Sequence, residues 1–236
     1  MTTKEKMNTN RKSAIIVGVL FILATTAGLI GEPARGIFAA PNYLANLSAN
    51  EKQVITIALS ELIMAILIVS ITFWMYPVLK KHDEATALGY VVFRVLEVVM
   101  FIVGVISMLT LLTLGQDFVN AGSQDAPYFQ TIANLLIAVR EWGGGVCSTI
   151  VFGLSALMLN YVLYRSKLIP RLLSGWGFIG AVLYIASGFL PLIGYGSRST
   201  IYVIMEIPLA LNEMAFALWL IIKGFNPAAI ESVPAE

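Results

Sequence analysis

The sequence has very few of the side chains that form metal and catalytic centres. Cys147 is the only cysteine and His82 the only histidine in 236 residues. A single cysteine excludes an internal disulfide and a cysteine-based metal site, and a single histidine cannot build a zinc or catalytic cluster. The chain also lacks a phosphate-binding glycine loop and a paired Ser/His or Cys/His motif. We therefore predict no catalytic residues, no metal and no cofactor.

Charge is scarce as well. Charged residues make up 12% of the chain, while 58% is hydrophobic and the mean hydropathy is +0.83. Since a soluble domain carries roughly twice that charged fraction, most of the surface has to be apolar, which suits lipid. The net charge of +1 gives no reason to expect a nucleic-acid partner. The composition predicts an integral membrane protein surrounded by a lipid bilayer.

Six apolar segments are long enough for a transmembrane helix, which needs roughly 20 residues. Because residues 143–164 alone would cross the bilayer, residues 126–142 form either an interfacial helix or the outward extension of a tilted one. The prediction is an all-α, polytopic transmembrane helix bundle, a single domain over residues 1–236. Its six spans lie at about residues 13–31, 54–79, 88–115, 128–164, 172–194 and 201–223.

The lysines and arginines favour one side of the membrane. Of the fifteen in the chain, ten fall on the side of the two termini, three on the other side, and two within spans. Because cytoplasmic loops are enriched in Lys and Arg, both termini are predicted to be cytoplasmic. The three on the opposite side are Arg35, Lys52 and Arg198, and the two within spans are Arg94 and Arg140.

Ionisable residues inside the spans are the main functional candidates. Each costs on the order of 2.5–3.5 kcal/mol at a helix centre, so each requires a partner or a role. Five acids face two bases, which leaves carboxylates uncompensated unless they are protonated, hydrogen-bonded or matched by a bound cation. The seven residues are Glu61, Arg94, Glu97, Arg140, Glu141, Glu206 and Glu213.

A deep polar layer is predicted from the third and sixth spans. Arg94 and Glu97 are three residues apart and share a helix face, so Arg94 pairs either with Glu97 or with Glu213. Glu213 lies near the midplane, directly after Asn212, and Pro208 is expected to kink the same helix.

An outer polar layer is predicted to contain Glu61, Arg140, Glu141 and Glu206, with Arg35 above it. If the fourth span starts at Gly143, the Arg140–Glu141 pair is interfacial and needs no function. Two interpretations of these layers stay open: structural ion pairs, or a water-accessible cavity that binds a polar ligand. In the second case the ligand-binding residues are Glu213, Arg94, Glu97, Asn212, Glu206, Glu61, Arg140 and Glu141.

Small residues recur at helical spacing and allow helix backbones to approach closely in lipid. The simplest interpretation is packing within one bundle, and the alternative is a homodimer through one such stripe. The stripes are Gly145, Thr149 and Gly153; Ala24 and Gly28; and Gly177 and Ala181.

Several stretches resemble an uncharacterised bacterial family of six-span membrane proteins catalogued only as a domain of unknown function. The resemblance is most specific over residues 152–225, with Phe152-Gly153-Leu154, Tyr164-Arg165-Ser166 and Trp219-Leu220, and it includes Phe93-Arg94-Val95-Leu96-Glu97. It implies that Arg94, Glu97 and Glu213 are signature charged positions, and that the protein lies in the bacterial cytoplasmic (inner) membrane. It implies no activity.

Three functions are compatible with these observations. The favoured one is an intramembrane polar cavity that binds or transports a small polar solute, proton or cation. The alternative is a non-catalytic sensor or partner protein that acts through helix contacts. A lipid-modifying membrane enzyme is the third, and the missing catalytic motifs count against it.

Overall fold

The computed structural model describes residues 3–30, 36–37, 42–122, 126–196 and 199–231. Within these ranges the chain is helical and has no strand. Six helical segments are long and apolar enough to cross a membrane, which confirms the predicted six-span, all-α bundle. They comprise residues Asn10–Ile30, Glu51–Leu79, Glu84–Ala121, Pro127–Ser166, Arg171–Ile193 and Thr200–Ile222.

Short elements connect or extend the long helices. The long ones are α1 (Thr3–Ile30), α3 (Glu51–Leu79), α4 (Glu84–Ala121), α6 (Ser148–Ser166), α7 (Arg171–Phe189) and α8 (Thr200–Ile222). The others are α2 (Tyr43–Ala49), α5 (Ala126–Val139), the π-helix η3 (Arg140–Cys147), the 3-10 helix η4 (Leu190–Ile193) and α9 (Pro227–Glu231).

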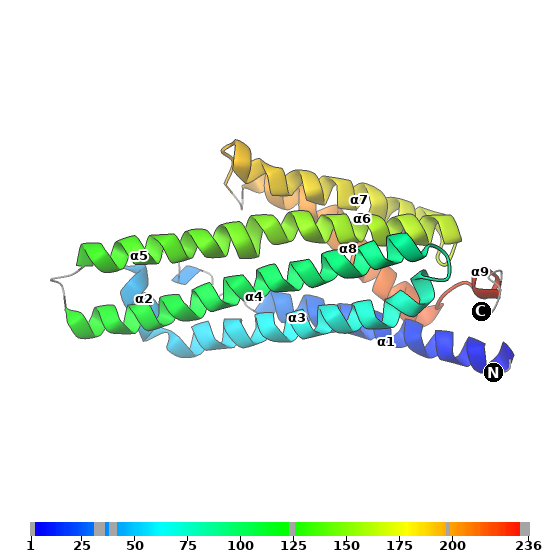
Figure 1. The fold of residues 1–236 in the computed structure, drawn as a ribbon, viewed down its shortest axis with the longest axis horizontal. Helices are drawn as coiled ribbons and strands as arrows, with labels where there is room; N and C mark the ends of the chain where they lie inside the picture. Colours follow the sequence, from blue (N-terminus) through cyan, green and yellow to red (C-terminus); the bar gives the residue numbers. More distant parts are fainter. Residues whose placement is uncertain (1–2, 31–35, 38–41, 123–125, 197–198, 232–236) are drawn as a thin grey trace.

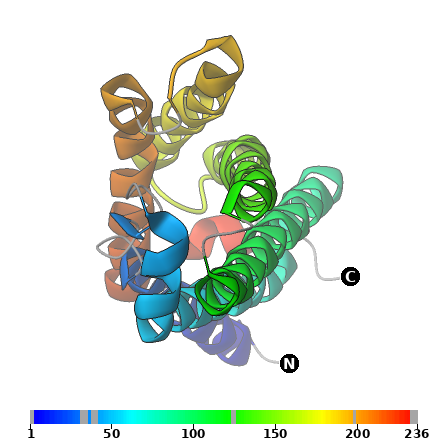
Figure 2. The ribbon, with the colours of Figure 1, turned by 90° about the vertical axis from the view of Figure 1, so that its left-hand side faces the viewer.

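The long helices form a ring in chain order. Each packs against the next one, from α1 through α3, α4, α6 and α7 to α8, and α8 packs against α1. Figure 2 looks along this ring from the end opposite the termini. Both termini lie at one end of the bundle (Figure 1), as an even number of spans requires. That this end is cytoplasmic stays a prediction.

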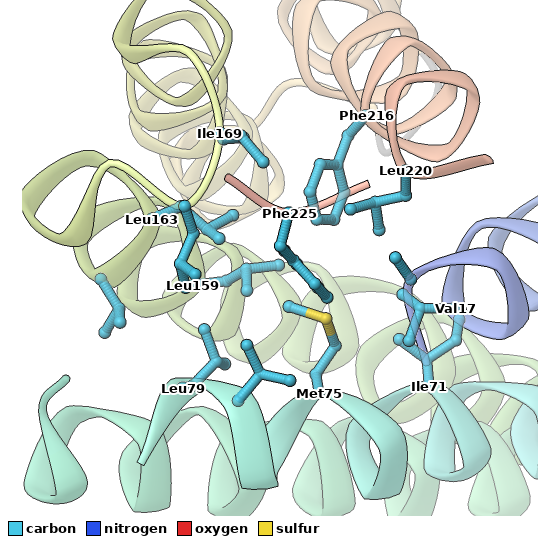
Figure 3. Packing of buried hydrophobic residues seen from close by; sticks show 14 of the residues in the cluster. Val17, Ile71, Met75, Leu79, Leu159, Leu163, Ile169, Phe216, Leu220 and Phe225 are labelled. Atoms are coloured by element: carbon cyan, nitrogen blue, oxygen red, sulfur yellow. The ribbon is translucent and has the colours of Figure 1, made fainter. Parts of the chain in front are cut away.

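Apolar side chains fill the ring at the end that carries the termini. Figure 3 shows Phe216 and Phe225 reaching toward Met75 of α3, with Val17 and Leu159 nearby. Phe225 follows α8 and is 6% exposed, so the chain after the last span folds back into this core.

A second apolar cluster lies at the opposite end. There Leu44 and Leu47 of α2 pack against residues of α3, α4 and α5. The fit against α4 is close, since a Cβ on Gly115 would lie 2.6 Å from the Leu44 carbonyl oxygen. Polar groups of the ring interior therefore lie between two apolar ends.

The fourth span continues outward instead of beginning with a separate interfacial helix. Segments α5, η3 and α6 form one continuous run (Figure 1), which decides between the two alternatives left open for residues 126–142. At about 1.5 Å per residue, its 40-residue length exceeds the roughly 30 Å hydrocarbon core. The run therefore extends beyond α7 and α8, with α4 alongside it.

The π-helical segment η3 contains three consecutive glycines, Gly143 to Gly145. Here the run crosses α4 at close range: a Cβ on Gly104 would lie 3.2 Å from the Gly144 Cα. The Ser148 hydroxyl donates to the carbonyls of Gly144 and Gly145, at 2.5 and 2.8 Å. The glycines thus allow two backbones to touch where the helix departs from α geometry.

Candidate functional site

A cavity of about 190 Å³ lies inside the ring. All six long helices contribute to its lining, so it is a feature of the assembled bundle and not of one helix pair. Its polar lining includes the three residues of the predicted deep layer, and its apolar lining is partly aromatic and partly aliphatic. The lining includes Phe21, Arg94, Glu97, Phe101, Thr149, Phe152, Tyr184 and Glu213.

Arg94 connects two carboxylates from different spans. Its Nη1 atom donates to Glu97 Oε2 at 3.0 Å, within α4, and its Nη2 atom donates to Glu213 Oε1 at 3.3 Å, on α8. The two pairings predicted as alternatives therefore occur together. The side chains of Arg94 and Glu97 are each 4% exposed, whereas that of Glu213 is 21% exposed. Glu213 is the most accessible of the three.

Aromatic rings surround the Arg94 guanidinium. Its central carbon lies 4.6 Å from the Phe152 ring centroid and 5.9 Å from that of Tyr90, both within the range of cation–π attraction. The Tyr184 ring packs edge-on against Phe152, with centroids 4.8 Å apart. Sequence reasoning missed this aromatic shell, although Phe152 belongs to the stretch that carries the family resemblance.

Two buried polar atoms here have no hydrogen-bond partner among the described residues, Arg94 Nε and the Tyr90 hydroxyl. An unpaired donor is costly where water is excluded. The cluster also holds one positive and two negative groups when all are ionised. With all three groups ionised, the cluster therefore lacks one positive charge.

Asn212 was predicted to bind ligand together with Glu213, but the structure directs its side chain to α7. Its Nδ2 atom donates to the Leu173 carbonyl at 2.8 Å. A Cβ on Gly177 of α7 would lie 2.5 Å from Asn212 Oδ1. Asn212 therefore links α8 to α7 and does not line the cavity.

The predicted outer layer assembles only in part. Arg140 and Glu61 form a two-pronged ion pair, with Nη2 2.6 Å from Oε1 and Nη1 3.3 Å from Oε2. Arg140 Nη1 also donates to the Gly104 carbonyl at 2.9 Å. Glu141 is exposed and Glu206 is half-buried, and neither lines the central cavity. Arg35, predicted to lie above this layer, falls outside the described residues, as does Arg198.

The small-residue stripes are used largely within the bundle. Gly153 faces Ile185 of α7, where a Cβ would lie 2.5 Å from the Ile185 Cγ1 atom. The Thr149 hydroxyl lies 2.9 Å from the Tyr202 hydroxyl of α8. Cys147, which lies between Gly145 and Thr149, is exposed. A homodimer through another stripe stays a prediction.

His82, the single histidine, lies in the turn between α3 and α4. It is half-buried, and burial together with the neighbouring Lys81 lowers its pKa. The neutral imidazole therefore prevails at pH 7. His82 is not among the residues that line the cavity.

One known protein family matches most of the chain. A family described as "Domain of unknown function (DUF4386)" matches residues 16–224. An uncharacterised protein of Archaeoglobus fulgidus is 31% identical over 85 residues, which are 36% of this chain and 49% of that relative. The match thus spans about half the length of the relative. No solved structure matches the chain.

Proposed function

This chain belongs to the family described as a domain of unknown function, DUF4386, and we propose that it binds a small cationic solute within the membrane, in the cavity bordered by Arg94, Glu97 and Glu213. The chain is a multi-span helical membrane protein. The family carries no activity from which a ligand could be taken, so the proposal rests on the cavity itself.

The observation that carries the proposal is the charge of the cluster. Arg94 contacts two carboxylates, on Glu97 and Glu213, and one guanidinium neutralises only one of them. An uncompensated charge in a low-dielectric interior is unfavourable by several kcal/mol, at about 2.5–3.5 kcal/mol on membrane-insertion scales. A bound cation would restore neutrality, since Arg94 is the only base among the described residues that line the cavity.

Exposure identifies Glu213 as the acceptor for that cation. Its side chain is 21% exposed, against 4% for Glu97, and both line the cavity. Glu97 is also held by Arg94 through the shorter contact, 3.0 Å against 3.3 Å. Glu213 therefore has more free surface and the weaker existing partner.

The size and the walls of the cavity favour a small organic cation. A volume of about 190 Å³ is below the roughly 300–1,000 Å³ of pockets for drug-sized ligands. Aromatic side chains of Phe21, Phe101 and Tyr184 line it, and aromatic faces attract alkylammonium groups. A solute with a few heavy atoms and one positive charge matches both properties.

Thermal unfolding in detergent with methylammonium or tetramethylammonium chloride tests the proposal, with sodium chloride at equal ionic strength as the reference. At ligand concentrations about 100 times the dissociation constant, binding to the folded state adds about 2.7 kcal/mol. For a chain of this size that corresponds to a Tm increase of roughly 5–10 °C. Glu213→Gln keeps the shape and removes the charge, so it should abolish the increase.

Glu61→Gln is the matched control, because it removes a carboxylate that does not line the cavity. This variant should keep the response to the organic cations, whatever its own stability. The proposal fails if neither cation raises the Tm of the wild type, or if Glu213→Gln responds as the wild type does. The first outcome would leave a proton, or the sodium ion of the reference solution, as the occupant that neutralises the cluster.

A further inference from the structure

A second and larger pocket lies at the end of the bundle that carries the termini. Its volume is about 600 Å³. It is bounded by the turn between α6 and α7, the end of α8 and the segment that follows α8. It shares no lining residue with the central cavity, so any function here is independent of the one proposed above.

Three cationic side chains line this pocket: Lys167, Arg171 and Lys223. All three residues are exposed. They come from three different segments, and no acidic residue is among the described residues that line the pocket with them. The Arg171 guanidinium also lies 5.3 Å from the Tyr164 ring centroid, which fixes its direction by cation–π attraction. The pocket therefore concentrates positive charge.

Hydrogen bonds hold the walls of the pocket together. Asn226 donates from its backbone N–H to the Leu168 carbonyl at 2.8 Å, and from its side chain to the Lys167 carbonyl at 3.2 Å. Lys167 itself adopts a left-handed conformation, with φ of 56°, in the turn that leaves α6. These contacts fix the segment after α8 against the α6–α7 turn, so the pocket is present without a ligand.

The remaining walls are apolar. Leu168 and Phe225 line the pocket and belong to the buried core at this end of the ring. Trp219 of α8 lines it as well and is half-buried. Tryptophan beside lysine and arginine at the end of a span is the pattern of the membrane–water interface. The pocket thus lies at the depth of lipid headgroups, with positive charge beside an apolar wall.

We propose that this pocket binds the phosphate headgroup of an anionic phospholipid in the leaflet on the side of the termini. Lysine and arginine donate charge-assisted hydrogen bonds to phosphate oxygens, and basic pockets between transmembrane helices accept such headgroups. The apolar wall with Trp219 contacts the glycerol and the start of the acyl chains. Free phosphate shares the headgroup chemistry and lacks this second contact, which is why the lipid is the ligand assigned.

Native mass spectrometry of the full-length protein in detergent tests this assignment. Wild-type protein should retain dioleoylphosphatidylglycerol more strongly than dioleoylphosphatidylcholine. The triple variant Lys167→Gln, Arg171→Gln, Lys223→Gln should lose that preference. Because each cation near an anionic surface contributes about fivefold in affinity, the loss should be on the order of 100-fold.

A control variant removes three cations at the same end of the bundle that do not line the pocket: Lys12→Gln, Lys80→Gln, Lys81→Gln. It has the same net charge as the test variant and should bind phosphatidylglycerol as the wild type does. Should the triple test variant not fold, Lys223→Gln and Arg171→Gln are each expected to weaken binding about fivefold on their own.

Three outcomes would overturn the proposal. The first is equal retention of the two lipids by the wild type. The second is equal loss of phosphatidylglycerol in the test and control variants, which would mean diffuse attraction by surface charge. The third is displacement of phosphatidylglycerol by sn-glycerol 3-phosphate at equal concentration, which would identify the phosphate alone as the ligand.

Discussion

Arg94 and Arg140 are both arginines inside the helix bundle, and each reaches from its own helix to a carboxylate on another. Arg140 contacts the Glu61 carboxylate twice, and it also donates to the Gly104 carbonyl. Arg94 contacts two acids, once each. The first set of contacts joins one base to one acid, and the second joins one base to two acids.

The difference indicates separate roles for the two clusters. A matched pair with a backbone contact fixes how η3 crosses α3 and α4, and such a device requires nothing further. The unmatched cluster borders a cavity lined by every long helix. The same kind of substitution should therefore change stability by different amounts in the two clusters.

The largest effect is expected from Arg94→Met. The substitution leaves two carboxylates facing each other in a buried site without a cation, and removing one partner of a buried pair costs about 3–5 kcal/mol. The protein should unfold roughly 6–20 °C lower in detergent or fail to accumulate. Arg140→Met should cost less, because that pair is more exposed, at 19% for Arg140 and 11% for Glu61. Equal losses in the two variants would remove the distinction between the clusters.

A smaller effect separates the acids. Glu61→Gln takes the only carboxylate from Arg140's two-pronged pair and should lower stability by about 1–3 kcal/mol. Glu213→Gln leaves Arg94 paired with Glu97 and removes the uncompensated negative charge, so its stability should equal or exceed that of the wild type. Thermal unfolding of the two variants near neutral pH measures the comparison. A loss in Glu213→Gln as large as that in Glu61→Gln would make Glu213 a structural partner and weaken the case for a binding site.

The smallest effect concerns a carboxylate outside the bundle interior, as a reference for both clusters. Asp83 caps α4, and its Oδ1 accepts the Thr86 backbone N–H at 3.0 Å. That hydrogen bond lowers the Asp83 pKa, so its stabilisation is present above the unfolded-state pKa of about 3.9. It is lost as the pH falls through the lower folded-state pKa. Asp83→Ala should cost about 0.5–1 kcal/mol near neutral pH.

Asp83→Asn is the control for this prediction, because asparagine also caps helices and has no charge to titrate. Its stability should stay close to that of the wild type near neutral pH and should not share the loss below about pH 4. Unfolding curves recorded between about pH 3 and pH 7 distinguish the variants. If Asp83→Ala shows the same acid sensitivity as the wild type, other carboxylates govern that range.

The spans were predictable because apolar runs of about twenty residues are typical of transmembrane helices. The contact of Arg94 with Glu97 was predictable as well, since residues three apart share a helix face. The ion pair between Glu61 and Arg140 was not predictable. The sequence gives the depth of each residue in the membrane, but it does not say which helices are neighbours. Only the ring order of the helices brings α3 and η3 to the same point.

Two predicted site residues illustrate what helical geometry alone leaves open. Asn212 and Glu213 are adjacent and therefore point about 100° apart, so only one of them can face the cavity; the structure selects Glu213. Glu206 and Glu213 do share a face, but they are about 10 Å apart along the helix axis at 1.5 Å per residue. Pro208 lies between them inside α8, and the cavity reaches only Glu213.

The order of helices in the ring has a consequence for how the protein is made. Because α1 is synthesised before α8 and the contact between them closes the ring, the cavity is incomplete until α8 enters the membrane. Arg94 arrives on α4 together with Glu97 and is already neutralised by a residue of its own helix. Glu213 arrives three spans later on α8, so the charge imbalance of the site arises only when α8 joins the bundle.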